Sequence, residues 1–130
     1  MEINVVAGVL VRDDASVLIA QRLPGTHMAG RWEFPGGKLE SGEIPREGLS
    51  RELREELGVE VLAAEPLLRL SHQYTDRQVH LDVWLVTQYQ GVPSSLEGQA
   101  LQWVLPELLH RIDLLDADAP IIEALLRRPG

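Results

Sequence analysis

The sequence predicts an α/β fold in which a mixed β-sheet lies between helices. Two observations favour this fold class. Segments rich in β-branched and apolar residues alternate along the chain with segments of helical character. Several of the extended segments also follow one another closely enough to pair as hairpins. Elements arranged in this way commonly form a sheet with both faces covered by helices.

The N-terminal part is expected to form strands joined by a turn and a loop. Three segments are rich in β-branched, apolar or aromatic residues and favour extended structure, namely 3–11, 17–21 and 32–34. Asp13 and Asp14 signal a turn, so the first two segments should form a hairpin. The stretch 23–31 contains two glycines and a proline and is a predicted loop. Pro35-Gly36-Gly37 should end the third strand.

A helix is predicted from Pro45 to Leu57. Proline suits the first helical position, where its missing N–H group costs nothing. Leu49, Leu53 and Leu57 recur at four-residue spacing and form an apolar stripe on one face. Gly58 suits the left-handed conformation that commonly ends a helix.

Extended segments dominate the second half of the chain. Strands are predicted at 59–63, 67–73, 79–89 and 99–104. A turn at 74–77 and a loop at 91–98 separate them. Pro106 and Pro120 are each placed to open a short helix.

Composition and charge limit the classes of function. The 130 residues suit one compact domain, and 45% apolar residues favour folding over disorder. No apolar run approaches the roughly 18 residues of a membrane span, and we see no signal peptide. The lack of cysteine excludes disulfides, zinc–thiolate sites and cysteine nucleophiles, and it fits a cytoplasmic location. The net charge of -8, with no cluster of lysine or arginine, argues against a duplex nucleic-acid partner.

The predicted helix carries more negative charge than its local energetics favour. Glu52, Glu55 and Glu56 share one face, where like charges repel by about 0.2–0.5 kcal/mol per pair. Two of them lie in the last turn, where the helix dipole disfavours carboxylates. One interpretation is a solvated acidic face, relieved by Arg51 and Arg54. The other is a cation site, because Mg²⁺ binds carboxylate and phosphate oxygens and would cancel the repulsion.

The residues around this helix decide between the two interpretations. Glu43 follows Gly37 after five residues, and the run RELREELGV follows after seven more. These are all the fixed positions of the Nudix box, G-x5-E-x7-R-E-U-x-E-E-x-G-U. Each fixed residue occurs at roughly 5–7% in average usage, so a chance match is on the order of one in a billion. The chain therefore resembles the Nudix hydrolase family, which favours the cation site.

Further stretches resemble the bacterial MutT branch of that family. They are GVLVR, Arg22, HMAGRWEFPGGK, Tyr74-Thr75-Asp76-Arg77, Glu97-Gly98-Gln99 before Trp103, and Ala117-Asp118-Ala119-Pro120. The resemblance implies the Nudix fold, an α/β/α sandwich, with residues 1–130 as a single Nudix domain. It also implies hydrolysis of a nucleoside triphosphate to the monophosphate and pyrophosphate. In that branch the substrates are oxidised purine nucleotides such as 8-oxo-dGTP, whose removal serves DNA repair.

The resemblance also implies a metal site that uses Mg²⁺, or alternatively Mn²⁺. Its ligands would be the Gly36 carbonyl, Glu52, Glu55, Glu56 and Glu97. One glutamate must act as the base, for which Glu52 is the first choice and Glu97 the alternative. Arg51 is expected to orient Glu52 through a charge-assisted hydrogen bond. Glu43 is expected to be structural, bonding the loop that leads into the helix.

Six residues are candidates for contacting the substrate: Arg22, His27, Phe34, Lys38, Tyr74 and Asp118. Arg22 and Lys38 could meet the phosphates, although an arginine at a strand end is commonly just exposed. His27 lies in a loop that could close over the nucleotide, or it is a plain surface histidine. Phe34 and Tyr74 could line a base pocket or belong to the core.

Asp118 departs from the MutT pattern, which has asparagine at the position implied to read the base. An ionised aspartate only accepts hydrogen bonds, whereas asparagine also donates them. Ordinary guanine presents acceptors at N7 and O6, but 8-oxoguanine carries a proton on N7 that the carboxylate could accept. The same carboxylate could instead accept from the N4 amine of cytosine. A structural alternative is that Asp118 caps the helix opening at Pro120.

Hydrolysis of CTP or dCTP is therefore the main alternative activity, and ADP-ribose cleavage is a weaker one. A non-catalytic nucleotide-binding regulator is the alternative from another class, but such domains often lose the carboxylates that this chain keeps. The expected partner is a small-molecule nucleotide, with neither a membrane nor duplex nucleic acid. The sequence carries no signal for an oligomeric state.

Overall fold

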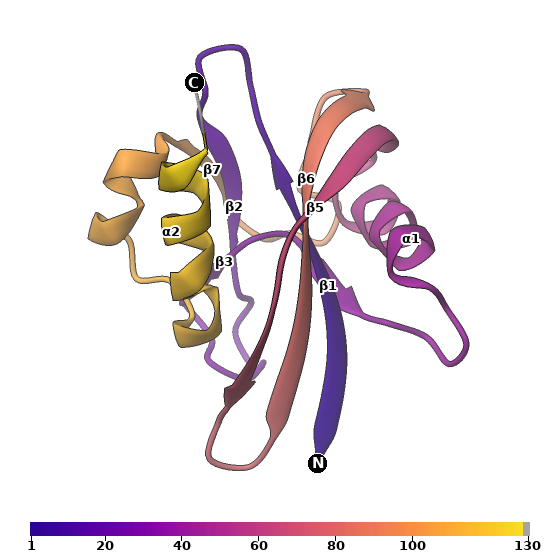
Figure 1. Cartoon of the computed structure of the whole chain (residues 1–130), viewed down its shortest axis with the longest axis vertical. Helices are drawn as coiled ribbons and strands as arrows, with labels where there is room; N and C mark the ends of the chain where they lie inside the picture. The colour runs from indigo at the N-terminus through magenta and orange to yellow at the C-terminus, as the bar shows by residue number, and fades with distance from the viewer. Residues whose placement is uncertain (129–130) are drawn as a thin grey trace.

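The structure is a computed structural model that describes residues 1–128. Its strands form two sheets that lie between two α-helices (Figure 1). The four-stranded sheet has the order β4-β1-β6-β5, with β1 at Glu2–Leu10, β4 at Gly36–Lys38, β5 at Glu60–Gln73 and β6 at Gln78–Gln90. The three-stranded sheet has the order β3-β2-β7, with β2 at Val17–Gln21, β3 at Trp32–Glu33 and β7 at Leu101–Val104.

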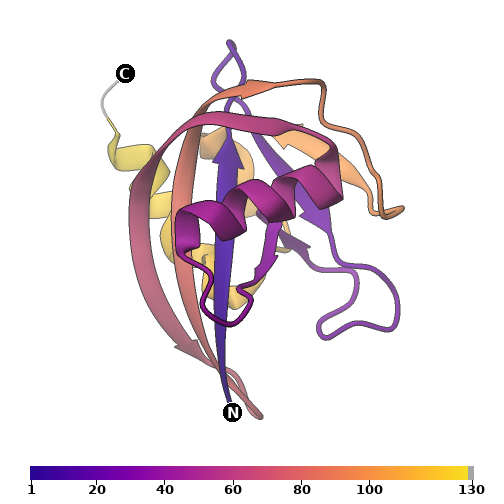
Figure 2. The same cartoon turned by 90° about the vertical axis from the view of Figure 1, so that its right-hand side faces the viewer.

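The helices lie on opposite sides of the strands. α1 spans Pro45–Leu57 and crosses the face of the four-stranded sheet (Figure 2). On the other side lie two 3₁₀ helices, η1 at Pro106–Arg111 and η2 at Asp116–Asp118, followed by α2 at Ala119–Arg127. The predicted α/β class, with a mixed sheet between helices, is confirmed. No helix within residues 1–128 has the length and apolar character needed to cross a membrane.

α1 has the bounds that the sequence predicts. Its apolar stripe is fully buried against β1 and β6, where Leu49, Leu53 and Leu57 pack with residues such as Val6 and Val86. Gly58 ends the helix with a φ of 72°, and its N–H group donates to the Arg54 carbonyl at 3.0 Å. The packing fixes the rotation of the helix, so the acidic face that adjoins the leucine stripe has a defined direction.

The predicted hairpin between the first two strands is wrong apart from one bridge between Val11 and Val17. Beyond that bridge, β2 leaves the first sheet and pairs with β3 and β7 instead. The reason is that both edges of β1 are occupied, by β4 on one side and by parallel β6 on the other. The strands therefore divide between two sheets rather than forming one.

Two further predictions need correction. Gly36 and Gly37 do not simply end a strand, because they belong to β4 and pair with Ala7 and Val6. A Cβ atom on Gly36 would lie 2.0 Å from the Val6 carbonyl oxygen, so only glycine allows this approach. The two strands predicted on either side of Pro66 are one continuous β5 with shifts in register. β5 tolerates the proline because it is an edge strand.

Two hydrophobic clusters position the site. One lies under α1 and includes Val6, Leu10 and Leu18, with Trp84 and Trp103 packed against it. The other lies on the side of α2 and includes Val83, Leu109 and Ile121, with Trp32 packed against it. All three tryptophans therefore pack against these clusters. Between the two clusters, β4 lies directly against the acidic face of α1.

Candidate active site

The three glutamates of α1 lie in different environments. Glu55 has a side chain that is 56% exposed, whereas that of Glu52 is only 15% exposed. The Glu52 carboxylate lies against β4, since a Cβ atom on Gly37 would be 2.5 Å from it. Burial raises the pKa of Glu52 above its usual value. Burial, with the charges of Glu52 and Glu97 adding to it, raises the pKa of Glu56 to about 9.

The Glu56 carboxylate has a buried oxygen atom, Oε2, without a hydrogen-bond partner among the described residues. An ionised carboxylate in such a place is costly unless a cation or a donor pairs with it. Glu97, in the loop between β6 and β7, is close enough for its charge to raise the pKa values of Glu52 and Glu56. These oxygen donors fit a hard divalent cation.

The carboxylates do not by themselves enclose a cation. Within residues 1–128, no three acidic or histidine side chains converge closely enough to hold a metal ion. Glu52 is engaged with Arg51 at 2.9 Å, and Glu55 is mostly exposed. A hard divalent cation can complete such a partial shell with water and phosphate oxygens. We name Gly36, Glu52, Glu55, Glu56 and Glu97 together the acidic site.

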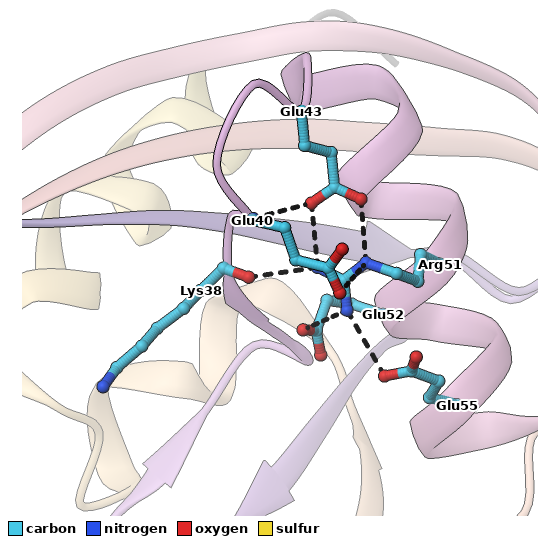
Figure 3. Close-up of polar contacts among 6 residues, drawn as sticks. All are labelled: Lys38, Glu40, Glu43, Arg51, Glu52 and Glu55. Carbon is cyan, nitrogen blue, oxygen red and sulfur yellow. Dashed lines mark hydrogen bonds and ion pairs between the residues drawn. The ribbon is translucent and has the colours of Figure 1, made fainter.

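Arg51 organises one side of the acidic site (Figure 3). Its guanidinium grips Glu43 with two hydrogen bonds, of 2.8 and 2.9 Å. It also donates to Glu52 at 2.9 Å and to the Lys38 carbonyl at 3.1 Å. The bonds from Arg51 hold the pKa of Glu43 at about 2, so this carboxylate stays ionised. The expected orienting bond to Glu52 is present, and Glu43 ties the loop before α1 to the helix.

All six residues predicted to contact the substrate line a single pocket, together with apolar residues of β1 and β6. We call it the apolar pocket; its predicted members are Arg22, His27, Phe34, Lys38, Tyr74 and Asp118. A neighbouring cavity contains Glu56 and Glu97. Arg22, Glu33 and Gly36 line both cavities. The apolar pocket and the acidic site are therefore contiguous.

Asp118 lies at the inner wall of the apolar pocket and is 4% exposed. Its Oδ2 atom accepts a hydrogen bond of 3.1 Å from the Phe34 N–H group. Burial raises the pKa of Asp118 to about 7, although the Phe34 N–H group opposes this shift. Asp118 occupies the N-cap position of α2 but makes no capping hydrogen bond. The capping alternative is wrong, because the side chain bonds to Phe34 instead.

Arg22 is anchored rather than free at a strand end. Its Nη1 atom pairs with Glu33 at 3.0 Å, and its Nε atom donates to the His27 carbonyl. Burial raises the pKa of Glu33, and Arg22 opposes that shift. Glu33 thus stands between the two cavities, and sequence reasoning assigned it no role. The available signal was a charged residue between two aromatic residues, Trp32 and Phe34, in a short strand.

The loop and turn at the rim of the apolar pocket are packed together. The His27 ring meets Tyr74 edge-on, with 5.4 Å between ring centroids. The Tyr74 hydroxyl accepts a hydrogen bond of 3.2 Å from the Ala117 N–H group. Among the described residues, Nε2 of His27 is buried without a hydrogen-bond partner. His27 is therefore no plain surface histidine. Arg77, for which no site role was predicted, also lines the apolar pocket.

Known proteins share both the sequence pattern and the fold. A family model described as NUDIX domain matches residues 6–124. The chain is 41% identical to the CTP pyrophosphohydrolase of Escherichia coli K12, over 95% of this chain and 91% of that protein. It is 33% identical to the 8-oxo-dGTP diphosphatase of the same organism, over 97% and 98%. The solved MutT protein of Methanosarcina mazei Go1 matches with a TM-score of 0.85 at 25% identity, over 97% and 94% of the two chains.

The fold and the likeness to these enzymes define a nucleotide pyrophosphohydrolase. The chain belongs to the Nudix hydrolase family and is MutT-like within it. Nudix hydrolases generally use divalent metal ions and act on small nucleotides.

Proposed function

We propose that the protein hydrolyses 8-oxo-dGTP to the nucleoside monophosphate and pyrophosphate, with Mg²⁺ or Mn²⁺ held in the acidic site. As a single Nudix domain in the cytoplasm, it would remove oxidised nucleotides. The observation that carries this proposal is the wall shared by the two cavities, formed by Arg22, Glu33 and Gly36. A nucleotide with its base in the apolar pocket would extend its phosphates past this wall toward the carboxylates.

The proposed reaction assigns chemical tasks to the metal ion and to several side chains of the two cavities. Phosphate anhydride hydrolysis requires a positioned water molecule and neutralisation of charge. A bound metal ion would supply Lewis acidity and lower the pKa of bound water. Glu52 would accept the proton of the attacking water, because Arg51 holds it at 2.9 Å in a fixed orientation. Glu97 is the alternative base, although its side chain is exposed. Arg22 and Lys38 would offset phosphate charge.

Asp118 is the proposed reader of the base. Its Oδ2 atom accepts from the Phe34 N–H group with one lone pair, which leaves the second lone pair of Oδ2 and the Oδ1 atom for a ligand. With a pKa of about 7, both the neutral and the ionised form are populated near neutral pH. The neutral acid can donate to O6 of 8-oxoguanine and accept from its N7–H group, as an asparagine amide would. The ionised form can only accept.

CTP or dCTP hydrolysis is the second candidate function. Two observations favour it: the relative that is 41% identical is named a CTP pyrophosphohydrolase, and an ionised Asp118 can accept from the N4 amine of cytosine. ADP-ribose cleavage would use the same phosphate chemistry with different substrate contacts, and no residue of the apolar pocket favours it.

A hydrolysis screen with product identification tests both candidates. The nucleotides are 8-oxo-dGTP, dGTP, CTP, dCTP and ADP-ribose, each with Mg²⁺, with Mn²⁺ and with excess chelator. We expect pyrophosphate and a monophosphate, metal-dependent turnover, and the largest kcat/KM for 8-oxo-dGTP. Strong turnover in chelator would contradict the metal proposal, and orthophosphate as the only phosphate product would contradict the cleavage position. A larger kcat/KM for CTP would select the second candidate.

A further inference from the structure

The loop that carries Glu97 is docked on the C-terminal end of α1. The last carbonyl groups of a helix have no partners within the helix and need donors from elsewhere. Here the Leu57 carbonyl accepts from the Ser94 N–H group at 3.0 Å, and the Glu56 carbonyl accepts from the Leu96 N–H group at 3.1 Å. The loop thus serves as a remote cap for the helix that bears the glutamates.

Gln99 joins this loop to the helix through its side chain. Gln99 is 6% exposed, and its Oε1 atom accepts from the Glu97 N–H group at 3.1 Å and from the Ser95 hydroxyl at 3.0 Å. Its Nε2 atom donates to the Glu56 carbonyl at 3.3 Å. The Glu97 N–H group can only donate and the carbonyl can only accept. To bond both the Glu97 N–H group and the Glu56 carbonyl, one side chain must carry an acceptor and a donor close together. The amide of Gln99 carries both.

The same geometry relates Gln99 to the acidic site. Gln99, Glu97 and Glu56 line one cavity. Glu97 itself is exposed, and Gly98 beside it has a φ of 84°, a left-handed conformation that glycine adopts without steric cost. The hydrogen bond from the Glu97 N–H group is thus the direct tie between this residue and the buried part of the protein.

We infer that Gln99 is a positioning residue that fixes Glu97 relative to Glu56 and thereby sets the metal affinity of the acidic site. This inference rests on the proposed function, because it takes Glu97 to be a metal ligand. Residues that hold a ligand in place commonly change metal affinity by 10- to 100-fold when they are lost. A purely structural glutamine would change the thermal stability and leave metal affinity unchanged.

The first experiment compares Gln99→Met with Gln102→Met, an identical substitution at an exposed position of β7. Mn²⁺ binding to the nucleotide-free protein is measured by electron paramagnetic resonance, and kcat and KM are measured for the best substrate. For Gln99→Met we expect Mn²⁺ affinity to fall about tenfold, the lower end for a lost ligand-orienting contact. We also expect kcat to fall while KM stays within a factor of about two, since the apolar pocket is untouched. Gln102→Met should match the wild type.

Ser95→Ala is a gentler second variant, in case Gln99→Met folds poorly. Ser95 is exposed, and its hydroxyl lies against both the backbone carbonyl and the side-chain Oε1 atom of Gln99. We expect its Mn²⁺ affinity to fall by about threefold, the scale of one neutral hydrogen bond. Wild-type Mn²⁺ affinity in both folded variants would overturn the inference.

A double-mutant cycle separates this inference from the proposed function. If Gln99 acts through Glu97, adding Gln99→Met to Glu97→Gln should cause no further loss of Mn²⁺ affinity. Fully additive losses would overturn the inference and leave Glu97 as a metal ligand. Unchanged Mn²⁺ affinity in Glu97→Gln alone would overturn the metal role of Glu97, and the inference with it.

Discussion

The acidic site and the apolar pocket share one wall but are built in opposite ways. All members of the acidic site except Glu97 come from the short stretch between Gly36 and Glu56. The apolar pocket collects residues from β1, the loop before β3, the β5–β6 turn and η2. The first concentrates negative charge, and the second is lined largely by apolar residues around the buried carboxyl group of Asp118. In the proposed function the hydrolytic chemistry is therefore encoded locally, whereas substrate choice depends on the tertiary fold.

The largest effect is expected in the acidic site. Glu52→Gln and Glu56→Gln should each lower kcat by at least about a hundredfold, the scale of losing a base or a metal contact. The ratio of kcat/KM between nucleotides should stay unchanged, because the apolar pocket is intact. Glu47→Gln, an exposed position of the same helix, is the control. Near-normal rates in both variants would place the chemistry elsewhere, and a changed base preference would show that the two regions are not separable.

Asp118→Asn should change the preference between nucleotides and have little effect on metal dependence, the opposite of the glutamate substitutions. An amide keeps an acceptor for the Phe34 N–H group and adds a permanent donor. We expect the kcat/KM ratio of 8-oxo-dGTP to CTP to rise about tenfold, the worth of one well-placed hydrogen bond. Asp116→Asn, an exposed position in the same 3₁₀ helix, should leave the ratio unchanged. An unchanged ratio in Asp118→Asn would remove Asp118 from base recognition.

The same residue should make selectivity depend on pH. Below pH 7 Asp118 is mostly protonated and can donate to O6 of 8-oxoguanine, whereas above pH 7 it is mostly ionised and can only accept. The preference for 8-oxo-dGTP over CTP should therefore fall about fivefold between pH 6 and pH 8, less than one tenfold step. Asp118→Asn should show a flat ratio over this range. A wild-type ratio that does not vary with pH would mean that Asp118 holds one protonation state throughout.

The smallest effect is expected from Glu55→Gln. Its side chain is 56% exposed, and exposed charges are screened by solvent and contribute little. We expect kcat to fall only about threefold, with Mn²⁺ affinity reduced to a similar degree, as suits a weak exposed charge. A loss as large as that of Glu56→Gln would show that Glu55 turns inward when a nucleotide binds.

The sequence predicts the local elements well and their partners poorly. Capping residues and the leucine stripe lie within the helix itself, so Pro45–Leu57 could be delimited without knowledge of the fold. Three features could not be predicted in this way: the split into two sheets, the strand β4 and the continuity of β5. They depend on strand pairing, and pairing depends on which strand edges remain open after β1 is enclosed. Hydrophobic periodicity carries no information about that choice.

The site also combines features that local sequence spacing predicts with features that depend on long-range contacts. Glu52, Glu55 and Glu56 share a helix face by their spacing, so their proximity follows from helical geometry alone. Glu33 and Gln99 belong to no comparable spacing pattern. Glu33 matters because it pairs with Arg22, and Gln99 matters because it donates to the Glu56 carbonyl, and neither contact follows from local geometry. Single polar residues of this kind become visible only when their burial and hydrogen bonds are known.

The location of Asp118 has a consequence for how such an enzyme can change over generations. The residue lies in η2, a short segment outside both sheets, on the side of the strands opposite α1 (Figure 1). A substitution there alters neither strand pairing nor the packing under α1. With Asp118 as the proposed reader of the base, gene duplicates could diverge toward different bases by changing this segment while inheriting α1 unaltered. One fold could in this way give rise to paralogues that hydrolyse different damaged nucleotides.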